Sequence, residues 1–464
     1  MNSNKTKIGL YGLAVMGQNL VKNFAQKKIP ISVFNRTTAK TLEFVKDNKS
    51  LPIKGTTSLE EFVLSIERPR KIILLVKAGD AVDKVIEQLL PFLEEGDILI
   101  DSGNSHFSDT QLRMQVLSER GIYFIGMGIS GGEKGALLGP SLMPGGDKKT
   151  VEHLLTLLRP VAAQLPQPCV AYMGNSFAGH YVKMVHNGIE YADMQMIADI
   201  YAMARKGMNW PNEKLHQLFS DFNKGELESY LIEITAKIFS QKDEESPDFL
   251  VDKILDVAQG KGTGKWNVEE AINLEMPVPS IEGALNLRSI SIQKKWRSQL
   301  SKIYPSQLQH LEIFEKDLEK ALLAAKVLAY VQGMDLLALA SDEYDLELDL
   351  GAVAKIWRGG CIIRSRLLNE IADSYADGYA SILLSPYFEN LLKENLPSLR
   401  KVVALGIQNS IGVPALACAL IYFDAITDDQ LPLNLVQAQR DFFGAHTYQR
   451  VDKVGESFHT KWEP

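Results

Sequence analysis

A glycine-rich turn near the N-terminus constrains the fold of this chain more than any other feature. The turn follows an apolar run at residues 8–11 and spells G-x-A-x-x-G from Gly12 through Ala14 to Gly17. Its small residues permit a tight turn, close approach of a pyrophosphate and close packing of a helix on a strand. The helix that follows offers unpaired N–H groups to phosphates. Such glycines also occur in ordinary strand–helix turns, but this context predicts a dinucleotide site formed by Gly12, Leu13, Ala14, Val15, Met16 and Gly17.

Short apolar runs alternate with amphipathic stretches through the first third of the chain. Strands are predicted at residues 8–11, 31–34, 71–76, 97–101, 123–126 and 169–173, with helices such as 18–27 and 81–93 between them. This alternation is typical of parallel βαβ units. Together with the turn, it predicts an α/β Rossmann-like N-terminal domain.

Helical periodicity replaces this alternation from about residue 177. It covers residues 177–205, 227–239, 249–259, 281–299 and 308–341, and a turn-rich tail follows from about Leu431. We therefore predict a Rossmann-like domain at 1–176, a large all-α domain at 177–434 and a C-terminal tail at 435–464. Similar segments at 222–234 and 357–371 indicate a possible internal duplication, with chance similarity of two leucine-rich helices as the alternative.

Composition narrows the class of protein. The 464 residues are 45% hydrophobic and 23% charged, with a net charge of −7, which is ordinary for a globular chain and a poor match to a nucleic-acid partner. The three cysteines are widely spaced and there is no cluster of metal ligands, so we expect neither disulfides nor a metal site. Without a signal-like N-terminus or an uninterrupted apolar span, we expect a cytoplasmic protein that contacts no membrane.

The end of the second predicted strand selects the dinucleotide. An NAD site usually has an acid here to hold the ribose hydroxyls, but this chain has Asn35, Arg36 and Thr37. The guanidinium of Arg36 can pair with a 2′-phosphate, which favours NADP as the dinucleotide. The alternative is that Arg36 is a solvated cation in a loop. Two further loops follow predicted strands and are expected to face the cofactor, with candidate residues Val76, Lys77, Ala78 and Asn104.

A chemically rich face lies on the helix predicted from residue 177. Its members lie within an arc of roughly 140°, and they are Lys183, His186, Asn187, Glu190 and Tyr191. Such a face can hold a polyhydroxylated anion and move protons on and off it. The alternative is the solvent-facing side of an ordinary amphipathic helix.

Three other clusters are candidates for ligand binding, each with an ordinary loop or surface cation as its alternative. The small-residue loop Ser130, Gly131 and Gly132 can hold a carboxylate through its N–H groups. The glycine-rich basic turn at 259–266 carries Lys261 and Thr263 and suits a phosphate, although it lacks the P-loop spacing. The tail adds Arg440 and His446.

Together these motifs resemble the decarboxylating 6-phosphogluconate dehydrogenases, and the resemblance covers nearly the whole chain. It rests on the stretches at residues 12–17, 35–37, 76–79, 130–133, 140–146, 183–191, 262–266 and 437–446. The resemblance implies NADP as cofactor, a duplicated helical domain, and a homodimer in which the tail of one subunit threads into its partner. It also implies a place in the pentose phosphate pathway and in gluconate use.

The resemblance further implies a role for each site residue. Lys183 would act as general base on the C3 hydroxyl during oxidation, and Glu190 would protonate C1 of the enediol that forms after loss of CO2, giving ribulose 5-phosphate. The carboxylate and hydroxyls of the substrate would be held by Asn104, Ser130, Gly131, Gly132, His186 and Asn187. Its phosphate would be held by Tyr191, Lys261, Thr263 and Arg288, together with Arg440 and His446 from the second subunit.

One departure from the family pattern and two rival functions remain. Ser102 occupies a position that is usually glycine in the family. The rivals are a 3-hydroxyacid dehydrogenase of the same superfamily and a non-catalytic NADP-binding sensor. The first class is shorter and lacks the tail, and intact Lys183 and Glu190 argue against the second.

Overall fold

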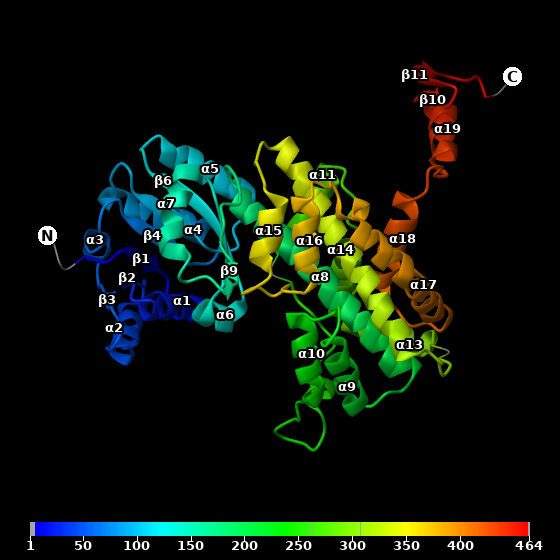
Figure 1. Ribbon diagram of the computed structural model, residues 1–464, viewed down its shortest axis with the longest axis horizontal. Coiled ribbons are helices and arrows are strands. Elements are labelled where there is room, and N and C mark those ends of the chain that lie inside the picture. The colour runs from blue at the N-terminus through cyan, green and yellow to red at the C-terminus, as the bar shows by residue number, and fades with distance from the viewer. Residues whose placement is uncertain (1–4, 261, 307, 463–464) are drawn as a thin grey trace. The chain divides into compact units, whose positions relative to one another are not determined.

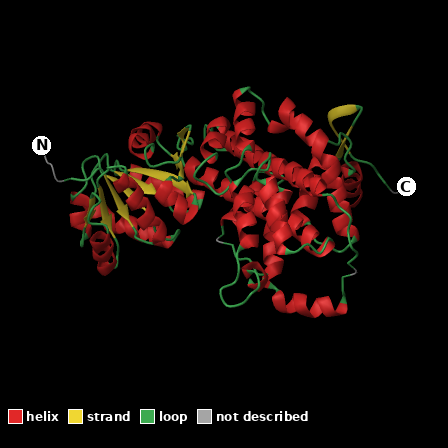
Figure 2. Cartoon of the chain, turned by 60° about the horizontal axis from the view of Figure 1, so that its bottom comes forward, coloured by secondary structure: helices red, strands yellow, loops and turns green. Residues whose placement is uncertain are grey.

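The computed structural model describes residues 5–260, 262–306 and 308–462. The chain packs as two compact units, Met1–Ala419 and Leu420–Pro464. The first unit contains a sheet with its covering helices and then a large helical part (Figure 1). Strands are concentrated in the N-terminal part and in a hairpin near the C-terminus, and most of the remaining chain is helical (Figure 2).

A seven-stranded sheet organises the N-terminal part. Its strands are β1 (Ile8–Tyr11), β2 (Ile31–Phe34), β3 (Ile53–Gly55), β4 (Lys71–Leu74), β5 (Ile98–Asp101), β6 (Tyr123–Ser130) and β7 (Ser141–Gly145). The strand order is β3-β2-β1-β4-β5-β6-β7, and all neighbours are parallel except β6 and β7. This order brings the carboxyl ends of β1, β2, β4 and β5 to one edge, where open sheets of this kind bind ligands. The predicted Rossmann-like fold is confirmed.

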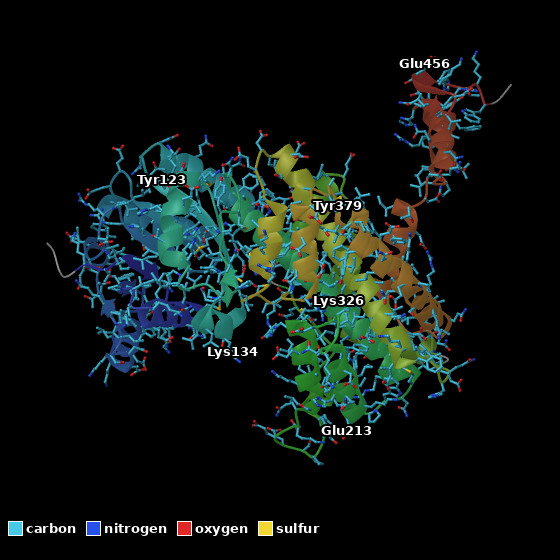
Figure 3. All side chains as sticks on the ribbon, viewed as in Figure 1. Tyr123, Lys134, Glu213, Lys326, Tyr379 and Glu456 are labelled. Atoms are coloured by element: carbon cyan, nitrogen blue, oxygen red, sulfur yellow. The ribbon has the colours of Figure 1, made fainter. Side chains whose placement is uncertain are left out.

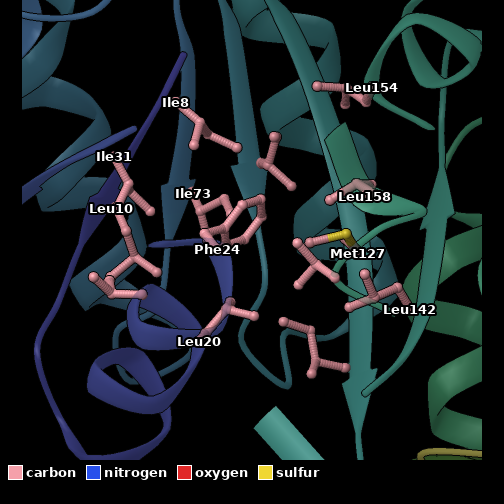
Figure 4. Close-up of a cluster of buried hydrophobic side chains, with 14 of the residues drawn as sticks. Ile8, Leu10, Leu20, Phe24, Ile31, Ile73, Met127, Leu142, Leu154 and Leu158 are labelled. Carbon is pink, nitrogen blue, oxygen red and sulfur yellow. The ribbon is translucent and has the colours of Figure 1, made fainter. Parts of the chain in front are cut away.

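Helices cover both faces of the sheet, as buried parallel strands require. They are α1 (Val15–Gln26), α2 (Thr38–Asp47), α3 (Leu59–Leu64), α4 (Asp80–Leu89), α5 (Phe107–Ser118), α6 (Gly132–Leu138) and α7 (Lys148–Leu158), with a short 3₁₀ turn η1 (Leu90–Phe92). Figure 4 shows the core on one face, to which Leu10 of β1, Phe24 of α1 and Leu158 of α7 contribute. A second core, which includes Phe62 of α3 and Val82 of α4, fills the other face.

The rest of the first unit is helical. It contains α8 (Ala178–Ala202), α9 (Asn212–Phe222), α10 (Tyr230–Ser240), α11 (Thr263–Asn273), α12 (Pro279–Ile292), α13 (Lys294–Ile303), α14 (Glu315–Glu343), α15 (Leu350–Trp357), α16 (Leu367–Ala376) and α17 (Pro386–Gln408), and α18 (Pro414–Ile426) begins in it. Short turns lie between them: the π turn η2 (Met203–Gly207) and the 3₁₀ turns η3 (Leu250–Lys253) and η4 (Ile382–Leu384).

The two longest helices of this part, α8 and α14, pack against each other. A buried ion pair links them, with Lys326 Nζ 3.0 Å from an Asp193 carboxylate oxygen, and Figure 3 marks Lys326 among the helices. Helix α14 is long and apolar enough to cross a membrane by composition alone, but most of its apolar stretch is buried inside the protein.

Glycines bring α8 close to the sheet. A Cβ atom on Gly179 would lie 2.1 Å from the carbonyl oxygen of Gly126, and one on Gly128 would lie 2.4 Å from the Cβ of Lys183. Larger residues at these positions would push the helix off β6. The close approach places Lys183 beside the strand that leads into the Ser130 loop.

The second unit is a small helix–hairpin assembly. It contains α19 (Leu433–Gly444), β10 (Tyr448–Arg450) and β11 (Lys453–Phe458). The buried Asp441 carboxylate accepts hydrogen bonds from the backbone of Thr447 and Thr460 at 3.0 and 3.1 Å and from Trp462 Nε1 at 2.9 Å. The expectation that helices end at about Leu431 was therefore wrong, because α19 follows that point.

Four other expectations about elements were wrong. Residues 169–173 form no strand, and only Val170 makes an isolated bridge to β7. Residues 249–259 contain only η3, and Ile254 and Leu255 are exposed there rather than on a buried helix face. The helix predicted at 281–299 is two helices that break at Gln293, and the one predicted from residue 308 begins at Glu315.

Two strands of the sheet, β3 and β7, were not predicted. Strand β7 contains Pro144 and ends at Gly145, residues that weaken a strand signal but are tolerated at the edge of a sheet. A minor hairpin of β8 (Gln164–Leu165) and β9 (Gln167–Pro168) follows α7.

Candidate active site

A cleft of about 760 Å³ opens where β1, β2 and β4 end. It is lined by Tyr11, Gly12, Ala14, Asn35, Arg36, Thr37, Lys40, Leu75, Val76, Lys77, Ala78, Gly79, Asp80, Ala81, Lys84, Val85 and Gln88. The cleft therefore unites the glycine turn, the Arg36 segment and the loop after β4. A volume of this size is within the usual range for cofactor sites.

The glycine turn has the geometry that its sequence predicts. Gly12 has a φ of +112°, and a Cβ atom there would lie 2.4 Å from the Leu75 carbonyl oxygen. A Cβ atom on Gly17 would lie 2.0 Å from the Gly12 oxygen. Helix α1 begins after Ala14 without a side-chain cap from the described residues. Its first N–H groups can therefore bind a phosphate.

The segment after β2 stabilises the glycine turn and contributes positive charge to the cleft. Asn35 Oδ1 accepts a hydrogen bond from the Leu13 N–H at 3.0 Å. Arg36 is exposed at the cleft, which it shares with Lys40, Lys77 and Lys84. Lys40 and Lys84 were missed by the sequence analysis, although Lys40 lies in the first turn of α2, three residues after Thr37. The excess of positive charge suits a ligand with several phosphates.

Five of the predicted cofactor residues do not line this cleft: Leu13, Val15, Met16, Gly17 and Asn104. The Leu13 side chain is buried in the core and its N–H is already bound to Asn35, while Gly17 packs against Gly12. Asn104 is exposed in the loop after β5. Cofactor contacts by these five residues remain predictions.

A buried arginine ties the loop after β5 to the loop after β4. Arg113 donates to both carboxylate oxygens of Asp83, at 2.7 and 3.0 Å, and to the Gly79 carbonyl at 3.3 Å. It also lies 3.4 Å from Asp101, whose carboxylate accepts a hydrogen bond from Ser105 Oγ at 2.6 Å. These bonds hold both ends of the loop that carries Asn104.

Ser102, the departure from the family pattern, lies in the same loop. Its N–H donates to the Leu74 carbonyl at 2.9 Å, while its hydroxyl is buried with no hydrogen-bond partner among the described residues. The backbone of Ser102 is not in the left-handed region that would require glycine. The serine is therefore accommodated without backbone strain.

The polar face of α8 forms a second cluster. His186 Nδ1 lies 3.4 Å from Lys183 Nζ, 3.1 Å from Asn187 Oδ1 and 3.7 Å from Glu190 Oε2. The other ring nitrogen, Nε2, lies 3.1 Å from Ser130 Oγ at the end of β6. The imidazole thus connects the Ser130 loop to the lysine and the carboxylate.

This face is buried, so the alternative of a solvent-facing helix side was wrong. Only 7% of Lys183 and none of His186 is exposed, and Asn187 and Tyr191 are also buried. Burial lowers the pKa of the Lys183 ammonium, although the Glu190 carboxylate opposes the shift. Burial, with Lys183 nearby, holds the pKa of His186 well below its usual range. A neutral histidine beside an amine that readily loses its proton is an arrangement for proton transfer.

Tyr191 is the centre of a third group. The guanidinium of Arg288 lies over its ring at 3.4 Å, and a Cβ atom on Gly264 would lie 2.6 Å from the same ring. Thr263 is buried at the first turn of α11. The structure therefore brings Tyr191, Thr263 and Arg288 together, whereas Lys261 lies outside the described residues. A threonine at a helix N-terminus and a stacked arginine can bind a phosphate.

The two predicted tail residues belong to the second unit. Arg440 lies on α19, where it donates to Gln437 Oε1 at 3.0 Å, and His446 follows that helix and contacts the ring of Phe443. Both side chains are exposed.

The end of α15 and the segment after it supply site residues that sequence reasoning missed. The indole of Trp357 packs edge-on to the His186 ring, with centroids 5.6 Å apart. The Ile362 N–H donates to Ser130 Oγ at 3.3 Å. The only sequence signal was that residues 357–360 begin one half of the possible duplication.

The fold and the site define a dinucleotide-binding dehydrogenase with a buried lysine beside its cofactor-binding sheet. Residues 7–174 match the NAD binding domain of 6-phosphogluconate dehydrogenase, and residues 179–462 match the C-terminal domain of 6-phosphogluconate dehydrogenase. The chain therefore belongs to the 6-phosphogluconate dehydrogenase family.

Individual relatives agree over almost the full length. The chain is 47% identical to the NADP(+)-dependent, decarboxylating 6-phosphogluconate dehydrogenase of Bacillus subtilis and 46% identical to the decarboxylating enzyme of Lactococcus lactis, with 99% of each chain covered. A solved Plasmodium falciparum 6-phosphogluconate dehydrogenase is 43% identical and superposes with a TM-score of 0.95, covering 98% of this chain and 100% of that one. The Plasmodium enzyme is known in its apo form and in complexes with its cofactor NADP+ and its substrate 6-phosphogluconate.

Proposed function

We propose that this chain catalyses the oxidative decarboxylation of 6-phosphogluconate to ribulose 5-phosphate and CO2, with NADP as the oxidant. The observation that carries this function is the cluster of the buried Lys183 and His186 with the partly exposed Glu190, beside Ser130. We also propose that the protein is cytoplasmic and that its reaction belongs to the pentose phosphate pathway. The names of the relatives, which include an NADP-dependent decarboxylating enzyme, support the reaction.

The cofactor cleft fits NADP. The uncapped start of α1 would hold the pyrophosphate, and Arg36 with Thr37 and Lys40 would hold the 2′-phosphate. The absence of an acid after β2 removes the group that would repel that phosphate. NADP supplies the acceptor for the hydride that leaves C3 of the substrate.

Lys183 is the proposed general base. As a neutral amine, it takes the proton from the C3 hydroxyl while the C3 hydride leaves, which gives a 3-keto acid. The C1–C2 bond then breaks, CO2 departs, and the electron pair moves through C2 to the C3 oxygen, which Lys183 reprotonates. Glu190, on the same face of α8, donates the proton that the resulting enediol needs at the carbon that lost CO2.

The remaining site residues are assigned to binding the substrate. Gly131 and Gly132 have φ values of +117° and +63°, a backbone shape that turns N–H groups toward an anion such as the substrate carboxylate. The hydroxyls and carboxylate are assigned to Asn104, Ser130, Gly131, Gly132, His186 and Asn187. The phosphate is assigned to Tyr191, Lys261, Thr263 and Arg288.

We also propose that the chain is a homodimer with shared sites. Arg440 and His446 of a second copy would complete the phosphate site, which explains why both are exposed on their own unit. The corresponding division of the chain is a Rossmann-like domain at 1–176, a helical domain at 177–434 and a partner-binding tail at 435–464.

The test is NADPH formation by the purified protein with 6-phosphogluconate, followed by absorbance. We expect Lys183→Ala to abolish turnover but to retain NADP binding, whereas Lys149→Ala on the exposed face of α7 behaves as wild type. Turnover of phosphate-free 3-hydroxy acids in place of 6-phosphogluconate would favour the 3-hydroxyacid dehydrogenase rival. NADP binding without any turnover would favour the sensor.

A further inference from the structure

A second concave site is lined by no described residue assigned to the substrate or the cofactor. It has a volume of about 460 Å³, and it lies between the β8–β9 hairpin at Leu165, the exposed carboxylate of Glu228 and the start of α16. Three arginines line it, namely Arg358, Arg364 and Arg366, together with Asn369. We call this cavity the arginine pocket.

The charges in the arginine pocket are not balanced. Arg364 pairs with Glu233, a carboxylate that it shares with Lys237. Arg358 donates to the uncharged Asn369 Oδ1 at 3.3 Å and to the Lys355 carbonyl at 3.2 Å. Within the part of the chain that the structure describes, neither Arg358 nor Arg366 forms an ion pair. Two arginines therefore face a cavity with Glu228 as the one lining carboxylate.

We propose that the arginine pocket binds a small phosphate-bearing anion, separately from the substrate and cofactor sites. A guanidinium presents a planar fork of donors that matches two phosphate oxygens, and two such forks in a cavity can hold a dianion. The apolar hairpin wall at Leu165 and the volume leave room for a few carbon atoms beyond the phosphate. The ligand class is thus a phosphomonoester or free phosphate.

The same chain segment contacts the candidate active site. Trp357, next to Arg358, packs on the His186 ring, and Ile362 binds Ser130 Oγ. Gly360, which lines the arginine pocket, accepts a hydrogen bond from the Ser141 N–H at 2.8 Å. An anion held by Arg358 and Arg366 would therefore bind to the segment that supports the substrate loop.

The test is calorimetric titration with orthophosphate of the full-length Arg288→Ala protein in saturating NADPH and without 6-phosphogluconate. The Arg288→Ala change disables the proposed substrate phosphate site and NADPH fills the cofactor cleft, so the remaining phosphate binding reports the arginine pocket. We expect Arg358→Met and Arg366→Met each to weaken that binding about tenfold or more, since each loses a charge-assisted contact. Glu228→Gln should strengthen it, and Arg120→Met, a surface change on the N-terminal part, should leave it unchanged.

These outcomes separate the pocket from the catalytic proposal. Orthophosphate binding that is absent in the Arg288→Ala protein, or that is equally strong after Arg358→Met or Arg366→Met is added to it, would overturn the arginine pocket. If the chain lacks the proposed dehydrogenase activity, the same ranking of the three pocket variants is still expected, because the titration contains no substrate and needs no turnover. Unchanged turnover in the pocket variants confirms that they are folded.

Discussion

At the scale of single residues, the proposed chemistry depends on the protonation of Lys183. Its ammonium is removed from water by α8, β6 and the Trp357 segment, so the charged form loses solvation and its pKa falls. The pKa of His186 is also lowered, so the imidazole stays neutral. It can therefore hydrogen-bond the substrate without adding a second positive charge.

This state predicts the pH dependence of the reaction. Because the base must be neutral, kcat/KM should fall as the pH decreases through the lowered pKa of Lys183, with a midpoint below 10.5. Removing the Glu190 charge in Glu190→Gln should lower that pKa further, since Glu190 raises it. The pH profile of kcat/KM measures the pKa of Lys183 in the wild type. In Glu190→Gln, which should have little turnover, the pH dependence of acylation of the Lys183 amine measures the same pKa. An upward shift in Glu190→Gln would contradict this electrostatic account.

Arg36 should decide between the two nicotinamide dinucleotides. Loss of its charge-assisted bonds to the 2′-phosphate is worth roughly 1.5–3 kcal/mol, so Arg36→Ala should weaken NADP binding about 10- to 150-fold. NAD lacks that phosphate, and its affinity should change by less than about threefold. Fluorescence titration with both dinucleotides measures the two effects, and equal losses would remove Arg36 from the 2′-phosphate site.

At the scale of elements, α18 is held by a carboxylate from another helix. Asp199 of α8 accepts hydrogen bonds from the backbone N–H groups of Ala415 and Leu416, at 2.8 and 3.1 Å. It thereby satisfies donors at the start of α18 that have no partner within the helix. Burial raises the pKa of Asp199 to about 7, although these hydrogen bonds oppose the shift.

The stability of α18 should therefore depend on pH. The folded pKa of about 7 exceeds the ordinary value of 3.8, so between these values the folded form binds more protons than the unfolded form. Stability thus falls as the pH rises through this window, by up to about 4 kcal/mol, and becomes constant above it. Hydrogen exchange of the Ala417 N–H measures the effect. We expect a flat profile in Asp199→Asn, and protection that increases with pH in the wild type would refute the linkage.

At the scale of the whole molecule, the second unit exposes an apolar surface that a partner would cover. Leu435, Phe442 and Phe443 of α19 are all more than half exposed, and with Trp462 they line a cavity of about 430 Å³. A contiguous apolar surface of this kind is typical of an interaction site. A second copy of this chain is the occupant that the proposed shared site requires.

Mixed dimers test that arrangement directly. Lys183→Ala and Arg440→Ala should each give an inactive or weak homodimer. In a heterodimer, however, one site has Lys183 from one chain and Arg440 from the other. Random reassociation should restore about a quarter of the wild-type activity, because half of the dimers are mixed and each has one intact site. Truncation before Leu435 should give no rescue when mixed with Arg440→Ala, because neither chain then supplies an intact tail. Activity that does not exceed the sum of the two homodimers would contradict sharing.

The sequence by itself determined the features that depend on local spacing. The turn from Gly12 to Gly17 was predictable because its backbone shape and its approach to Leu75 require small residues at fixed positions. The position of Arg36 at the cleft was predictable because the segment after the second strand of this fold lies at the edge of the sheet where ligands bind. Most of the parallel strands were predictable because each is a short apolar run.

Only the tertiary structure decided the environment of the helix at 183–191. A polar stripe on a helix is compatible with solvent or with a buried site, and what packs against it lies far away in the chain. Ser130 reaches His186 from 56 residues upstream, and Ile362 reaches Ser130 from 232 residues away. The burial that lowers the pKa of Lys183 comes from these distant segments, so no local pattern encodes it.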